Sequence, residues 1–140
     1  MLMKYAWYLL IGVSILTVIA LTAHFVKSDE NMGQPTTFRS SGYEVHLQMN
    51  EAPVKPMTNH DLIISIQDDL GLPVDAAEIS ISLRMPDMFC GTFNFTAEQT
   101  SPGMYKSTVK PVMPGIWDVE ASIRIGSKLL DVTHTFRTAP

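Results

Sequence analysis

The sequence has a single cysteine, Cys90, so no disulfide can form within the chain. Basic residues are also few: 10 Lys and Arg stand against 14 Asp and Glu, and the formal net charge is −4. Such a chain lacks the basic surface with which proteins neutralise the phosphates of nucleic acids, so we exclude nucleic acid as a partner. A domain of about 100 residues can bury enough apolar surface to fold without disulfides.

Catalytic motifs are missing as well. The sequence contains no Gly-x-Ser-x-Gly turn, no P-loop, no HExxH helix and no glycine-rich dinucleotide loop. The four histidines are scattered along the chain, and the acidic pair Asp68-Asp69 precedes Gly71 as in an ordinary turn. We therefore predict that the protein is not an enzyme.

Charged residues are absent from one long stretch near the N-terminus. Residues 6–26 contain no Asp, Glu, Lys or Arg. As a helix they would measure about 31 Å, which matches the hydrocarbon thickness of a bilayer. Lys4 precedes this stretch, and Asp29 and Glu30 follow it, so the positive-inside rule places the N-terminus in the cytoplasm. The sequence predicts a single-pass membrane protein whose C-terminal domain is extracytoplasmic.

The remainder of the chain shows alternating apolar and polar residues. Residues 28–42 are polar and contain Gly, Pro and Ser, as in a juxtamembrane linker. Beyond them a period of two, which is typical of strands, recurs in seven segments: 43–49, 62–66, 79–85, 93–95, 105–109, 117–125 and 130–136. We predict an all-β fold, an Ig-like antiparallel β-sandwich of about seven strands preceded by one transmembrane α-helix. The predicted parts are an anchor at 1–27, a linker at 28–42 and the sandwich at 43–140.

One segment between predicted strands combines soft metal donors. Met85, Met88 and Cys90 supply two thioethers and a thiol within six residues, the donor type that selects Cu(I). If the chain stays extended after Pro86, Phe89 points inward while Met88 and Cys90 point to the surface. A second interpretation is equally simple, because methionine fills core gaps and a lone cysteine often behaves as a small buried hydrophobe.

Several short motifs resemble a known family when they are taken in order. They are Asp68-x2-Gly71-x-Pro73-Val74-x2-Ala76, Glu78-Ile79-x-Ile81, Met85-Pro86, Gly103-x-Tyr105 and Met113-x-Gly115-x-Trp117-x-Val119. Together they resemble the YtkA-like and FixH-like family of membrane-anchored or lipid-anchored extracytoplasmic domains. The resemblance covers about residues 43–137, and the predicted N-terminal anchor agrees with its FixH-like branch.

The resemblance implies an Ig-like sandwich without catalysis that serves copper handling or the assembly of haem–copper oxidases. It makes Met85, Met88 and Cys90 the first-choice ligands for Cu(I), with His134 or His60 as a completing donor. The partner would be a membrane protein complex such as an oxidase or a copper transporter. The alternative is a metal-free interaction module in which Met88 and Phe89 contact the partner.

Overall fold

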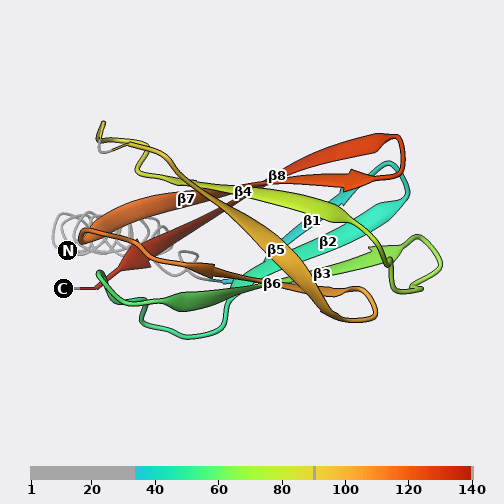
Figure 1. Ribbon diagram of the computed structural model, residues 1–140, viewed down its shortest axis with the longest axis horizontal. Helices are drawn as coiled ribbons and strands as arrows, with labels where there is room; N and C mark the ends of the chain where they lie inside the picture. The colour runs from blue at the N-terminus through green and yellow to red at the C-terminus, as the bar shows by residue number, and fades with distance from the viewer. Residues whose placement is uncertain (1–33, 90, 140) are drawn as a thin grey trace, which may run out of the picture. The chain divides into compact units, whose positions relative to one another are not determined.

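The computed structural model describes residues 34–89 and 91–139 (Figure 1). These residues form eight strands and no helix, and they belong to one compact unit, residues 32–140. The strands are β1 (Thr36–Ser40), β2 (Tyr43–Met49), β3 (His60–Asp68), β4 (Glu78–Arg84), β5 (Phe93–Ser101), β6 (Met104–Val109), β7 (Gly115–Ile125) and β8 (Lys128–Thr138).

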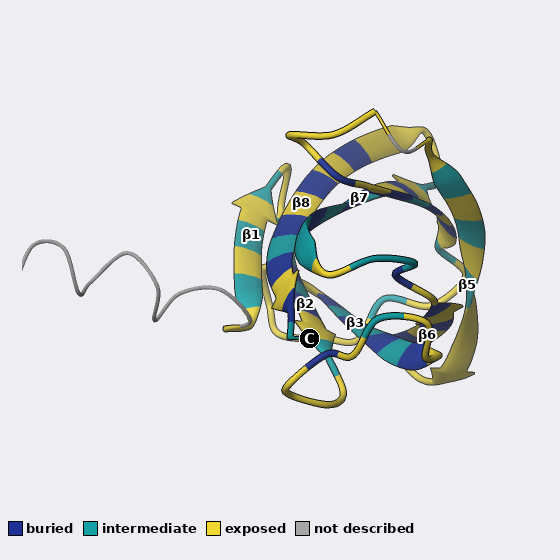
Figure 2. Ribbon diagram, turned by 90° about the vertical axis from the view of Figure 1, so that its left-hand side faces the viewer, coloured by how far each residue is buried: buried dark blue, intermediate teal, exposed yellow. Residues whose placement is uncertain are grey.

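The all-β prediction is confirmed, but the architecture differs from a sandwich of two separate sheets. All eight strands pair antiparallel in one continuous sheet, in the order β1-β2-β3-β6-β5-β4-β7-β8. Viewed along the strands, this sheet curls into a nearly closed barrel (Figure 2). The first part of β5, through Ala97, pairs with β4, whereas its last part, from Glu98, pairs with β6. A register shift between Gln99 and Ser101 accompanies this change of partner, so β5 joins what would otherwise be two sheets.

The additional strand β1 lies within the range expected to be linker. Its five residues pair with β2 through a turn at Ser41-Gly42, where both residues have positive φ, 54° and 83°. β1 also lies beside β8, the other end of the sheet order, and Thr36 Oγ1 is 2.9 Å from His134 Nδ1. The sequence pattern did not predict this short strand, because its residues alternate only between half-buried and exposed positions.

The core follows from the period-two pattern. In β7 the apolar members of the alternation, Trp117, Val119, Ala121 and Ile123, are all buried, and their polar neighbours are not. The same alternation along β3, β4 and β8 fills the inside of the curled sheet. Apolar burial on this scale is the main stabilising term for a domain that has no disulfide.

The barrel has two ends with different loops. One end carries the β1–β2, β3–β4, β5–β6 and β7–β8 connections. The other carries the loops at 50–59, 85–92 and 110–114, together with the start of β1 and the end of β8 (Figure 1). We call the second the entry end, because the described chain enters its first strand there.

The predicted anchor, residues 6–26, lies outside the described residues. Within 34–89 and 91–139 the structure contains no helix of the length and apolarity needed to cross a bilayer. The anchor, the orientation and the extracytoplasmic location therefore stay predictions.

Candidate functional site

Met85 directly follows β4 and faces the core. Its side chain is only 7% exposed, and a Cβ added at Gly115 would lie 2.5 Å from its Cε atom. The missing side chain of Gly115 thus leaves the space that the Met85 thioether occupies. Met85 continues the inward face of Ile81 and Leu83, as the alternation of β4 indicates.

Met88 and Phe89 lie at the surface of the loop that follows. Met88 is 52% exposed and Phe89 is fully exposed. Phe89 would point inward only if the chain stayed extended after Pro86, and this condition is not met, because residues 86–88 turn and the two-residue parity with Phe93 is lost. The surface position of Met88 agrees with the prediction, and Cys90 lies outside the described residues.

His134 lies on the inner face of β8 and is 1% exposed. Its Nδ1 contacts Thr36 Oγ1, its ring lies 6.2 Å from that of Phe136, and its buried Nε2 has no hydrogen-bond partner within the described part of the chain. His60, the other histidine considered, is also buried at the start of β3. Its Nε2 lies 2.9 Å from the Lys55 carbonyl oxygen, so it holds the 50–59 loop in place.

These placements separate the candidate donors. Met85, directly after β4, and His134, on β8, both face the core, whereas Met88 lies on an exposed loop. Among residues 34–89 and 91–139, no three His, Cys, Asp or Glu side chains gather closely enough to hold one metal ion. Among the described residues this loop therefore offers Met88 as an accessible soft donor, and Cys90 lies two positions further along the sequence.

Burial of the His134 ring lowers its pKa, since the charged form loses solvation there. The unfolded chain then binds more protons than the folded chain around the ordinary histidine value of about 6.5. The contribution of His134 to the free energy of unfolding is therefore largest above pH 6.5, and it decreases as the pH is lowered toward the pKa of the folded state. We expect the free energy of unfolding to fall between pH 7.5 and 5, with a contribution from His134 of up to about 1.4 kcal/mol per pH unit.

The measurement for this prediction is urea unfolding at several pH values for the parent and for His134→Leu. The variant should show a shallower pH dependence, because leucine fills the site without a titrating group. Equal slopes in the two proteins would contradict the prediction.

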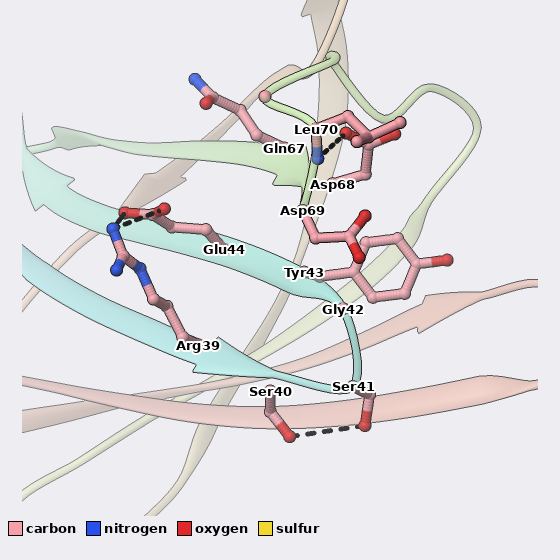
Figure 3. Close-up of a pocket in the computed structure, with 11 residues that line it drawn as sticks. Arg39, Ser40, Ser41, Gly42, Tyr43, Glu44, Gln67, Asp68, Asp69 and Leu70 are labelled. Carbon is pink, nitrogen blue, oxygen red and sulfur yellow. Dashed lines mark hydrogen bonds and ion pairs between the residues drawn. The ribbon is translucent and has the colours of Figure 1, made fainter.

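The structure also has a cavity that no sequence motif indicated. A cavity of about 720 Å³ lies at the opposite end from the entry loops, between the β1–β2 turn and the β3–β4 loop (Figure 3). Three of its charged groups serve the fold: Arg39 pairs with Glu44 at 2.9 Å and lowers the pKa of that carboxyl, and Asp68 Oδ1 accepts bonds from the N–H groups of Leu70 and Leu72. Since these groups already have partners, we do not assign the candidate site to this cavity.

The motifs that carry the family resemblance contact one another. Gly103 packs against Pro73, and the buried Tyr105 hydroxyl donates to the Val74 carbonyl at 2.8 Å and accepts from Ala77 N–H at 3.0 Å. Asp75 Oδ1 accepts from Gly103 N–H at 3.0 Å. The β3–β4 loop is thereby fastened to the β5–β6 turn, so both motifs serve the same structural joint.

The remaining motif supports the entry end. Trp117 Nε1 donates to the Met113 carbonyl at 3.0 Å, and its ring lies 6.3 Å from that of Phe93. Gly115 makes room for Met85. The motif therefore supports both ends of the loop that carries Met88 and Phe89.

Fold and loop together define the class: an all-β domain on a curled antiparallel sheet, with an exposed methionine loop at its entry end. Within that class the chain belongs to the YtkA-like family, whose model matches residues 37–122. The family was predicted from the sequence and is confirmed. The comparison with curated proteins finds no match.

Two solved structures are similar in part. An engineered protein has a TM-score of 0.48 and 14% identity, covering 76% of this chain and 20% of its own. A DUF4785 family protein from Legionella pneumophila subsp. pneumophila str. Philadelphia 1 has a TM-score of 0.49 and 10% identity, covering 72% of this chain and 29% of its own. The chain thus spans less than a third of the length of either.

Proposed function

We propose that this protein is a membrane-anchored extracytoplasmic accessory protein that holds or passes Cu(I), near an oxidase or a copper transporter, without catalysing a reaction. The observation that supports it most directly is the exposure of Met88, 52%, on a loop whose sequence continues to Cys90. Membership of the YtkA-like family supports the same proposal.

The donor chemistry fits a soft monovalent ion. Thioether and thiolate sulfur select Cu(I) over harder cations, and a thioether keeps its donor atom in an oxidising compartment where thiols form disulfides. Met88 is free to bind at the surface, whereas Met85 would have to leave its place against Gly115. In this proposal Met88 and Cys90 are the first ligands, and Met85 has a mainly structural role. His134 bonds to Thr36 at the β1–β8 contact and is not required.

The proposal predicts one tight equivalent of Cu(I) for each chain. The full chain, in detergent micelles and without oxygen, is titrated with Cu(I) against a chromogenic competitor. We expect the parent to remove one equivalent from the competitor, and we expect Met88→Ala/Cys90→Ser to remove none because both proposed sulfur ligands are gone.

Met57→Ala is the matched control for this titration. Met57 is a thioether of similar exposure, 63%, on another loop of the same end. The control should retain the tight equivalent. If the parent fails to compete, or if the control loses as much copper as the double variant, copper binding at Met88 and Cys90 is ruled out.

One observation favours a second candidate function, a metal-free module that docks on a membrane protein complex. Phe89 is fully exposed, and an aromatic side chain in that position is typical of contact residues. This function predicts that Phe89→Ala weakens the complex while Cys90→Ser has no effect. The copper proposal predicts instead that Cys90→Ser impairs function while Phe89→Ala has no effect, so this pair of variants separates the two candidate functions.

A further inference from the structure

Three large apolar side chains stand exposed on the loops of the entry end. Met57 is 63% exposed, Met88 52% and Phe89 fully exposed. Met57 belongs to the loop between β2 and β3, and the other two belong to the loop between β4 and β5. Figure 2 looks onto this end and shows both loops projecting from opposite sides of the barrel rim. The opposite end exposes three as well, Leu70, Leu72 and Leu129, so the entry end is distinguished by the chain that enters it and not by exposed apolar side chains alone.

The loop that carries Met57 has a defined backbone. Met57 has a φ of 61°, which non-glycine residues seldom adopt, and its N–H donates to the Pro111 carbonyl at 2.7 Å. His60 adds its bond to the Lys55 carbonyl in the same loop. These bonds fix the backbone that carries the exposed thioether, and the bond to Pro111 ties the 50–59 loop to the 110–114 loop.

The chain enters the domain at this same end. β1 begins at Thr36, which pairs with Leu47 close to the end of β2 that leads into the 50–59 loop. Only residues 27–35 separate Thr36 from the apolar stretch 6–26, and nine residues reach at most about 32 Å when fully extended. The β1–β2 turn at the opposite end lies roughly 17 Å from the start of β1, because β1 has only five residues.

The charges at this end neither favour nor oppose an anionic surface. Its exposed loop residues include two acidic ones, Glu51 and Asp87, and two basic ones, Lys55 and Lys110. A contact made here would thus depend on apolar side chains. Phenylalanine and methionine are suited to the boundary between headgroups and acyl chains, where apolar groups leave water without crossing the bilayer.

We propose that the entry end rests on the lipid surface, with Met57, Met88 and Phe89 inserted at the boundary between headgroups and acyl chains. The inference rests on the membrane anchoring in the proposed function and extends it, because it fixes which end of the domain meets the bilayer. In this orientation the loop of Met88 would stay at the depth of a membrane-embedded partner, which would raise the effective concentration for copper transfer between the two.

Tryptophan fluorescence in vesicles tests this orientation. The full chain carries Trp7→Phe, so that Trp117 in the core is the only native tryptophan left. One variant adds Phe89→Trp at the entry end, and the matched control adds Leu70→Trp, whose native side chain is 80% exposed at the opposite end. Both are reconstituted in phosphatidylcholine vesicles with and without a nitroxide near the top of the acyl chain.

We expect the nitroxide lipid to reduce the added emission of Phe89→Trp at least twofold and to leave that of Leu70→Trp unchanged. Equal responses at the two positions would overturn the proposal. Flotation of the same vesicles separates this failure from that of the anchor: protein that floats without quenching at position 89 contradicts only the orientation, whereas protein that does not float contradicts the anchoring as well.

Discussion

Gly103→Ala is expected to lower the free energy of unfolding by about 3 kcal/mol, from left-handed backbone strain and overpacking together. Gly103 has a φ of 68°, and an added Cβ would lie 2.7 Å from Pro73 Cβ and 2.8 Å from the Ile66 carbonyl oxygen. That oxygen already accepts a hydrogen bond from Val74 N–H at 3.0 Å, so it cannot move away without breaking the joint. Urea unfolding followed by circular dichroism measures the change.

Gly126→Ala is the control for the backbone contribution alone. Gly126 also has a positive φ, 59°, in the β7–β8 turn, but an added Cβ there meets no atom within 4 Å. This variant should lose only about 1 kcal/mol, the typical cost of a left-handed residue that has a Cβ. If the two alanine variants lose equal stability, the close approach between the β5–β6 turn and Pro73 does not constrain the fold.

Trp117→Ala is expected to lower the free energy of unfolding by about 4 kcal/mol, within the usual range for a buried tryptophan. Trp117 is 0% exposed and is the largest side chain of the core. Its removal leaves a cavity beside Phe93 and takes away the donor to the Met113 carbonyl. Thermal and urea unfolding both measure the effect.

Trp117→Phe separates the cavity from the lost hydrogen bond. Phenylalanine restores much of the ring volume, while the Met113 carbonyl still accepts from the Thr138 hydroxyl at 3.1 Å. We expect a loss of about 1.5 kcal/mol, well below that of the alanine variant. A phenylalanine variant as unstable as the alanine variant would show that the indole N–H, and not the packing, carries the stability here.

The contacts of Gly103 and Trp117 also explain why short sequence motifs indicated the family. Gly103-x-Tyr105 serves the joint with Pro73 and Val74, and Gly115-x-Trp117 serves the base of the loop that bears Met88. Each motif contains a glycine that gives room and an aromatic residue that fills the core or bonds to a loop. The family resemblance thus reflects how the loops are fixed, and copper binding at Met88 and Cys90 needs its own test.

Local patterns predicted the strands well and the loops poorly. The alternation from Trp117 to Ile125 identified β7 and its buried face, because side chains along a strand point to opposite sides. The same parity rule failed for Phe89, since a turn at residues 86–88 breaks the alternation. β1 was missed because its five residues are never fully buried.

The sequence by itself determined the all-β class, the inward face of most strands and the family, since each depends on residue spacing along the chain. Only the tertiary structure decided that the strands form one curled sheet, because β5 divides its pairing between β4 and β6. It also separated Met85 and His134 from Met88, although the sequence had grouped all three as possible donors. The physical reason is that burial and proximity depend on which strands pair, and residue spacing along the chain does not specify the pairing.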